Sequence, residues 1–193
     1  MASATADRPP KAAERIQTAA KDLFHRQGIR ATGVEEVCRA AEATKMSLYR
    51  AYPSKDALVA AILCQDAAAY GAWFAEATAA APTPAAKLRA AVEAFAAKLE
   101  GPEHLGCPLL LAQAEFRDPG HPTHRLVAEH KTRMRDALAG LARDAGAVEP
   151  GLLGDALAML VDGAWSALPY LGGARAAEVL RRTTAAVLRD ALP

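Results

Sequence analysis

The sequence predicts an all-α protein: an N-terminal three-helix domain with a helix-turn-helix, followed by a C-terminal helical bundle, with about nine helices in all. Apolar residues recur at intervals of three and four along almost every segment. Alternating runs of β-branched and aromatic residues, which would indicate strands, are absent. Gly28, Pro53 and Pro119 interrupt the helical pattern where helices are expected to end.

The N-terminal part is expected to hold one ordinary helix over 10–27 and two short helices over 34–41 and 45–49. After Pro53, Ser54 is an expected N-cap for a long helix that begins near Lys55. This pattern predicts three parts of the chain: an arm over 1–10, a helix-turn-helix domain over 11–54 and a helical domain over 55–193.

The C-terminal part shows the same period in longer segments. Leu88, Val92, Phe95 and Leu99 mark one helix by their spacing of four, three and four. Further helical segments are expected over 106–118, 126–145, 152–171 and 174–192.

The composition is that of a globular protein. The chain has 193 residues, of which 52% are hydrophobic, and a net charge of +1. No signal peptide or long membrane-spanning apolar run is evident, so a cytoplasmic protein with no membrane partner is expected. The three cysteines are far apart and odd in number, which argues against a disulfide framework and a structural zinc site.

Charge is unevenly distributed. Residues 1–60 carry ten Lys/Arg and seven Asp/Glu, a balance of +3, whereas the remainder carries thirteen and fifteen, a balance of −2. A mildly basic N-terminal part on a mildly acidic remainder is compatible with a nucleic-acid-binding head.

Two short helices joined by a turn of about three residues have helix-turn-helix geometry. The second helix can enter the DNA major groove, which is about 12 Å wide, while the first crosses the backbone. Apolar contacts between the two helices are expected from Val34, Val37, Ala41 and Leu48, and Thr44 is expected to cap the second helix.

The run Leu48 to Leu58 reads L-Y-R-A-Y-P-S-K-D-A-L. It matches the pattern L-Y-x-x-(aromatic)-x-S-K-x-x-L and resembles the DNA-binding signature of the TetR family over about residues 11–60. The resemblance implies a homodimeric, ligand-responsive transcriptional regulator, most often a repressor. Two positions depart from the family pattern: Glu42 replaces the usual turn glycine, and Gly33 stands where a threonine or serine cap is common.

The resemblance also implies residue roles at a palindromic double-stranded operator. Thr32 and Tyr49 would bind phosphates, and Lys55 would contact another phosphate. Lys45, Met46 and Ser47 would face base edges or the adjacent backbone. The expected DNA-binding set is therefore Thr32, Thr44, Lys45, Met46, Ser47, Tyr49 and Lys55.

The C-terminal part is expected to bind an unknown small-molecule effector and to dimerise. The stretch 106–116 is similar to a common TetR C-terminal subgroup, and large residues on inward-pointing faces suggest an apolar cavity. The expected pocket residues are Trp73, Phe95, Gln113, Phe116, His130, Met134, Met159, Asp162 and Trp165. The last two long helices are the expected dimer interface, through Leu153, Leu157, Val161, Trp165, Leu168, Leu180 and Val187.

Two other classes of protein remain as alternatives. An enzyme could use His121, His124 and His130 with Asp118 as a metal cluster. Histidines at a helix start are more often surface or capping residues, however, and no nucleophile-elbow, phosphate-loop or H-E-x-x-H motif occurs. We therefore expect no catalytic residues, no metal and no cofactor. The other alternative is a helical dimeric interaction protein with a degenerate helix-turn-helix, which Glu42 would favour.

Overall fold

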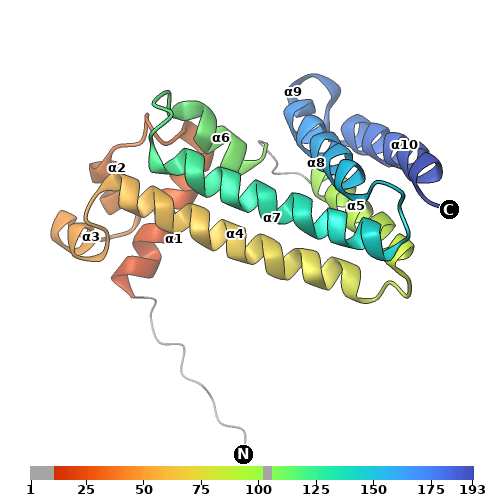
Figure 1. Ribbon diagram of the computed structural model, residues 1–193. Helices are drawn as coiled ribbons and strands as arrows, with labels where there is room; N and C mark the ends of the chain where they lie inside the picture. The colour runs from red at the N-terminus through yellow and green to blue at the C-terminus, as the bar shows by residue number, and fades with distance from the viewer. Residues whose placement is uncertain (1–10, 102–105) are drawn as a thin grey trace, which may run out of the picture. The chain divides into compact units, whose positions relative to one another are not determined.

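A computed structural model describes residues 11–101 and 106–193. These residues form ten helices and no strand, which confirms the all-α prediction (Figure 1). The helices are α1 (Ala12–Gln27), α2 (Val34–Ala40), α3 (Lys45–Ala51), α4 (Lys55–Ala79), α5 (Pro84–Leu99), α6 (Pro108–Glu115), α7 (Pro122–Asp144), α8 (Pro150–Ser166), α9 (Leu168–Leu171) and α10 (Gly173–Ala191).

The tenth helix arises because the segment expected as one helix over 152–171 is broken at Ala167. Pro169 is the second residue of α9 and has no N–H to donate to the preceding turn. The helix expected over 106–118 is also shorter than predicted, since α6 ends at Glu115.

The chain divides into two compact units, Met1–Ile62 and Leu63–Pro193, and the division falls inside α4. The arm expected over 1–10 lies outside the described residues. In the first unit, Ile16 of α1, Val37 of α2 and Leu48 of α3 are fully or almost fully buried. These side chains form a small core that holds α2 and α3 on α1.

The core of the second unit is built from α5, α7, α8 and α10. Two glycines allow close approaches between these helices. A Cβ on Gly154 of α8 would lie 2.7 Å from the Cβ of Ala139 on α7, and one on Gly173 would lie 2.1 Å from the carbonyl oxygen of Leu99. The α7–α8 and α5–α10 contacts therefore require glycine at these two positions.

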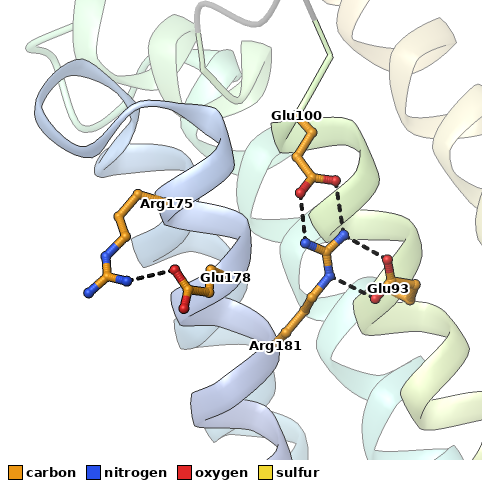
Figure 2. A network of polar contacts seen from close by, with 5 residues as sticks. All are labelled: Glu93, Glu100, Arg175, Glu178 and Arg181. Carbon is orange, nitrogen blue, oxygen red and sulfur yellow. Dashed lines mark hydrogen bonds and ion pairs between the residues drawn. The ribbon is translucent and has the colours of Figure 1, made fainter.

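A charged network also joins α10 to α5 (Figure 2). The guanidinium of Arg181 donates two hydrogen bonds to Glu93, of 2.8 and 2.7 Å, and two to Glu100, of 2.7 and 2.9 Å. These hydrogen bonds lower the pKa of both carboxyl groups. Bidentate arginine–carboxylate pairs have a fixed geometry, so the network fixes the orientation of α10 on α5.

Helix α4 is the one helix in the described part of the chain that is long and apolar enough to cross a membrane by length and composition. From the sequence, no segment of this kind was expected. The same test is passed by helices of soluble proteins, so this single helix is weak evidence for a membrane span.

Candidate nucleic-acid interface

The turn between α2 and α3 begins with a helix C-cap that has two nested backbone hydrogen bonds. The N–H of Ala43 donates to the carbonyl of Cys38 at 2.9 Å, and the N–H of Glu42 donates to the carbonyl of Arg39 at 3.2 Å. This is the Schellman pattern, which places one residue in the left-handed conformation. That residue is Glu42, with φ of 49°, so a glutamate adopts a backbone conformation that favours glycine.

Arg15 of α1 donates hydrogen bonds to the backbone of this turn. Its Nε donates to the carbonyl of Ala41 at 3.1 Å, and its Nη2 donates to the carbonyl of Glu42 at 3.3 Å. Carbonyl groups at a helix C-terminus lack partners inside the helix. The guanidinium therefore satisfies the C-cap carbonyl of Ala41 and the turn carbonyl of Glu42, and it connects α1 to the turn.

The start of α3 has the predicted cap. The side chain of Thr44 accepts a hydrogen bond of 3.1 Å from the N–H of Ser47, and the two hydroxyl oxygens lie 3.0 Å apart. An N-cap of this kind typically stabilises a helix by about 1 kcal/mol. Thr44 thus fixes where α3 begins.

The outer face of α3 is exposed within its unit. Met46 is 72% exposed and Tyr49 48% exposed, while Leu48 between them is fully buried. Lys45 is also exposed, and Ser47 is half-buried. One side of α3 therefore packs on the core, and the other presents an apolar, a phenolic and a basic side chain together.

Thr32 does not belong to this surface. It is fully buried, and its hydroxyl donates a 2.8 Å hydrogen bond to the carbonyl of Gly28. The prediction that Thr32 contacts a phosphate is therefore wrong, because its hydroxyl is enclosed in the loop between α1 and α2.

Lys55 begins α4, and its Nζ lies 5.9 Å from the centre of the Phe24 ring. The hydroxyl of Tyr52, just after α3, lies 3.3 Å from the carbonyl oxygen of Ala13 and 3.3 Å from Oε1 of Gln17, both on α1. Tyr52 thereby fixes the end of α3 on α1.

Three residues of this unit were not predicted as functional from the sequence: Arg15, Glu35 and Tyr52. Tyr52 was the aromatic position of the family pattern, so a signal for it was present. Arg15 contacts Ala41 in the turn, 26 residues later in the sequence, and Glu35 contacts Lys45 of α3, 10 residues later. Local sequence patterns do not indicate contacts over such separations.

In the second unit, part of the expected effector pocket comes together as an aromatic cluster. The Trp73 and Phe95 rings meet edge to face at 5.2 Å, and Tyr70 contacts both rings as well as that of His130 at 4.9 Å. The Tyr70 hydroxyl is buried and has no hydrogen-bond partner among the described atoms. Burial raises the pKa of Tyr70 far above its ordinary value and lowers that of His130.

Asp162 lies at the edge of this cluster. Its Oδ1 is 2.5 Å from Nζ of Lys131, and both side chains are less than one-third exposed. The charge of Asp162 also contributes to raising the Tyr70 pKa.

Other expected pocket residues lie elsewhere in the second unit. Met134 is buried in the core, and Trp165 packs against that core. Phe116 stacks on His121 at 3.8 Å, and Gln113 is half-buried on α6. Met159 is 74% exposed, which corrects its expected place in an interior pocket.

The expected dimer face also needs correction. Leu153, Leu157, Val161 and Leu180 are at most 3% exposed and form the chain's own core. Trp165, Leu168 and Val187 are partly buried against that core. The exposed apolar residues on these helices are their neighbours: Leu152, Met159 and Val179. The helical spacing of the apolar residues is as predicted, but the apolar face they form packs into the core of the same chain.

The histidines after α6 have structural roles. His121 caps α7 by accepting a hydrogen bond of 3.3 Å from the N–H of Thr123. Nε2 of His124 lies 2.8 Å from the carbonyl oxygen of Phe116. Within the described ranges, no group of three or more His, Cys, Asp or Glu residues could hold a metal ion.

Comparison with known proteins agrees with this geometry. The family model described as "Bacterial regulatory proteins, tetR family" matches residues 16–62. A TetR-family transcriptional regulator from Streptomyces coelicolor is 30% identical over 93% of this chain and 95% of its own, with a TM-score of 0.89. A TetR regulator from Streptomyces avermitilis is also 30% identical, over 94% and 98%, with a TM-score of 0.82.

Escherichia coli NemR, in its reduced form, is 20% identical over 95% of this chain and 98% of its own, with a TM-score of 0.80, and so shares the fold. No curated protein matches the sequence.

A capped, outward-facing α3 on a three-helix unit, joined to a larger helical unit, defines a DNA-binding transcriptional regulator. The chain belongs to the TetR family. Members of this family bind DNA operators, act as dimers and are generally not enzymes.

Proposed function

We propose that this protein is a repressor that binds a palindromic operator as a homodimer in the cytoplasm and is released from it by a small molecule. The observation that carries the proposal is the exposed face of α3, where Lys45, Met46 and Tyr49 surround the buried anchor Leu48. A helix held by its inner face and free on its outer face can be inserted into a major groove.

The proposed DNA contacts are Thr44, Lys45, Met46, Ser47, Tyr49 and Lys55. Lys45, Met46 and Ser47 lie in the first turn of α3, from which recognition helices contact base edges. Lys55 begins the next helix and would bind a phosphate. Phosphate contacts hold the protein in register, and base contacts supply the sequence preference.

The proposed dimer face uses the outer sides of α8 and α10. Leu152 and Met159 are seven residues apart, so they share one face of α8, and both are more than half exposed. Val179 is the exposed apolar residue of α10. Two head units would then meet half-sites about 34–36 Å apart.

The proposed effector site is the aromatic cluster of Tyr70, Trp73, Phe95 and His130. Ligand sites are mostly apolar with a few polar groups that orient the ligand, and the buried Tyr70 hydroxyl is such a group. Helix α4 carries both Lys55 and Tyr70. We infer that a ligand shifts α4 and changes the spacing of the two recognition helices, with a coupling of about 1–3 kcal/mol.

Operator binding is tested by fluorescence anisotropy on a duplex from the promoter region of the protein's own gene. Tight, salt-dependent binding is expected, with log K falling linearly against log salt. A thermal-shift screen then finds compounds that stabilise the protein, and an effector must also weaken the duplex complex. Stabilising compounds that all leave duplex affinity unchanged would contradict release by a ligand.

The residue roles are separated with two variants. Lys55→Ala is expected to weaken all duplexes evenly and to reduce the salt slope by about one. Ser47→Ala keeps the backbone N–H that Thr44 caps and is expected to change the preference among operator variants instead. Identical profiles for the two variants would contradict the assignment.

A further inference from the structure

The basic residue of the recognition helix is already paired inside the head. Nζ of Lys45, at the start of α3, forms an ion pair and a short hydrogen bond with Oε1 of Glu35 on α2. The two side chains are 56% and 64% exposed. An ion pair this exposed contributes little to stability, so the fold does not depend on it.

The pairing keeps both groups charged. The hydrogen bond and the opposite charge raise the pKa of Lys45 and lower that of Glu35. Because the negative charge of Glu35 lies beside the Lys45 ammonium, a DNA phosphate is attracted to this pair less strongly than to an unpaired lysine. If Lys45 approaches DNA, it must leave Glu35 or bring that carboxylate close to the phosphates.

We propose that Glu35 is an intramolecular competitor of DNA: it holds Lys45 in the free protein and thereby lowers the affinity and the salt dependence of operator binding. The inference rests on the proposed contact of Lys45 with DNA. Glu35 is a positioning residue under this proposal, because it acts through Lys45.

The neighbouring Glu36 provides a matched control. It lies on the same helix and has the same charge, but it accepts a 3.1 Å hydrogen bond from Nε2 of Gln27 on α1. Glu36→Gln therefore makes the same change in net charge as Glu35→Gln and leaves the Glu35–Lys45 pair in place. A difference between the two variants that disappears without Lys45 reports the pair.

The test measures anisotropy of two labelled duplexes, the promoter region and a scrambled sequence of equal length, over a range of salt. Glu35→Gln is expected to bind about two- to fivefold more tightly than Glu36→Gln, with a steeper salt slope by up to about one. In a Lys45→Ala background, Glu35→Gln and Glu36→Gln are expected to give the same increment. Circular dichroism melts check that all variants are folded.

Equal affinities and slopes for Glu35→Gln and Glu36→Gln would overturn the proposal, as would a gain from Glu35→Gln that persists without Lys45. Weaker binding by Glu35→Gln would overturn it too, since the carboxylate would then hold Lys45 in its DNA-binding position. Should Lys45→Ala alone leave affinity and slope unchanged on both duplexes, the proposed DNA contact of Lys45 fails, and the inference fails with it.

Discussion

The guanidinium of Arg15 donates a hydrogen bond of 3.3 Å to the backbone carbonyl of Glu42, the one described non-glycine residue with a positive φ. Glu42 occupies the turn position where the left-handed backbone favours glycine. The turn of this helix-turn-helix is therefore held from α1, by a contact between residues 27 positions apart.

Replacing Arg15 is expected to loosen this turn. Arg15→Met keeps much of the aliphatic stem and removes both hydrogen bonds to the turn carbonyls. A hydrogen bond that involves a charged group typically contributes about 1.5–3 kcal/mol to stability. Because the turn positions α3, part of this loss should appear in DNA binding, and operator affinity should fall about fivefold or more. Arg26→Met, which breaks only the exposed pair with Asp22 on the same helix, removes the same charge and is the control. Equal losses in the two variants would assign the effect to charge alone.

Glycine at position 42 is expected to relieve backbone strain. The left-handed conformation destabilises the folded state by roughly 1–2 kcal/mol for an L-residue. Glycine removes this strain, but its greater flexibility in the unfolded chain lowers stability by about 0.4–1 kcal/mol. Glu42→Gly should therefore stabilise the protein by up to about 1.5 kcal/mol, measured by urea unfolding. Glu42→Gln removes the charge and keeps the Cβ, so it should leave stability nearly unchanged. If Glu42→Gln stabilised the protein as much, strain would not be the cause.

Much of the fold follows from local sequence signals. The long helices lie within a few residues of their predicted ranges because their apolar period and their caps are local. Thr44 and His121 were both expected near helix starts, and both accept hydrogen bonds there. The break at Ala167 was missed because the apolar period of α8 continues past it, although Pro169 prevents a continuous helix.

The sites were less predictable because they depend on which face of a helix points inward. Met159 lies on an apolar-looking stripe, yet it is exposed, while Leu157 two positions earlier is fully buried. Thr32 has a hydroxyl group of the kind that binds phosphates, but this hydroxyl donates a hydrogen bond inside its own loop. The partner of Lys45 depends on a contact across the turn, which local spacing does not encode.

Charge on the outer face of α8 is expected to break the dimer without unfolding the chain. Met159→Glu places a carboxylate at a position that is 74% exposed in one chain. A monomer tolerates this change, whereas an apolar interface does not. Light scattering after size exclusion should show a shift toward monomer, together with weaker operator binding. Val148→Glu alters a residue that is 88% exposed between α7 and α8 and should remain dimeric. A fully dimeric Met159→Glu variant would exclude this face.

His130 is expected to make the second unit sensitive to acid. Burial lowers its pKa from the ordinary 6.5, and the positive charges of Lys131 and Arg133 act in the same direction, against the weaker opposing effect of Asp162 and Asp66. The unfolded chain therefore binds this proton at a higher pH than the folded chain does. It follows that stability decreases as the pH falls below about 6.5 and levels off once the pH is below the folded pKa.

His130→Phe keeps an aromatic edge against Tyr70 and removes the titrating group. Urea unfolding between pH 7.5 and about 5 should show a smaller loss of stability for this variant than for the unchanged protein. An unchanged pH dependence in His130→Phe would mean that His130 is as easily protonated in the folded protein as in water, against its burial beside Tyr70.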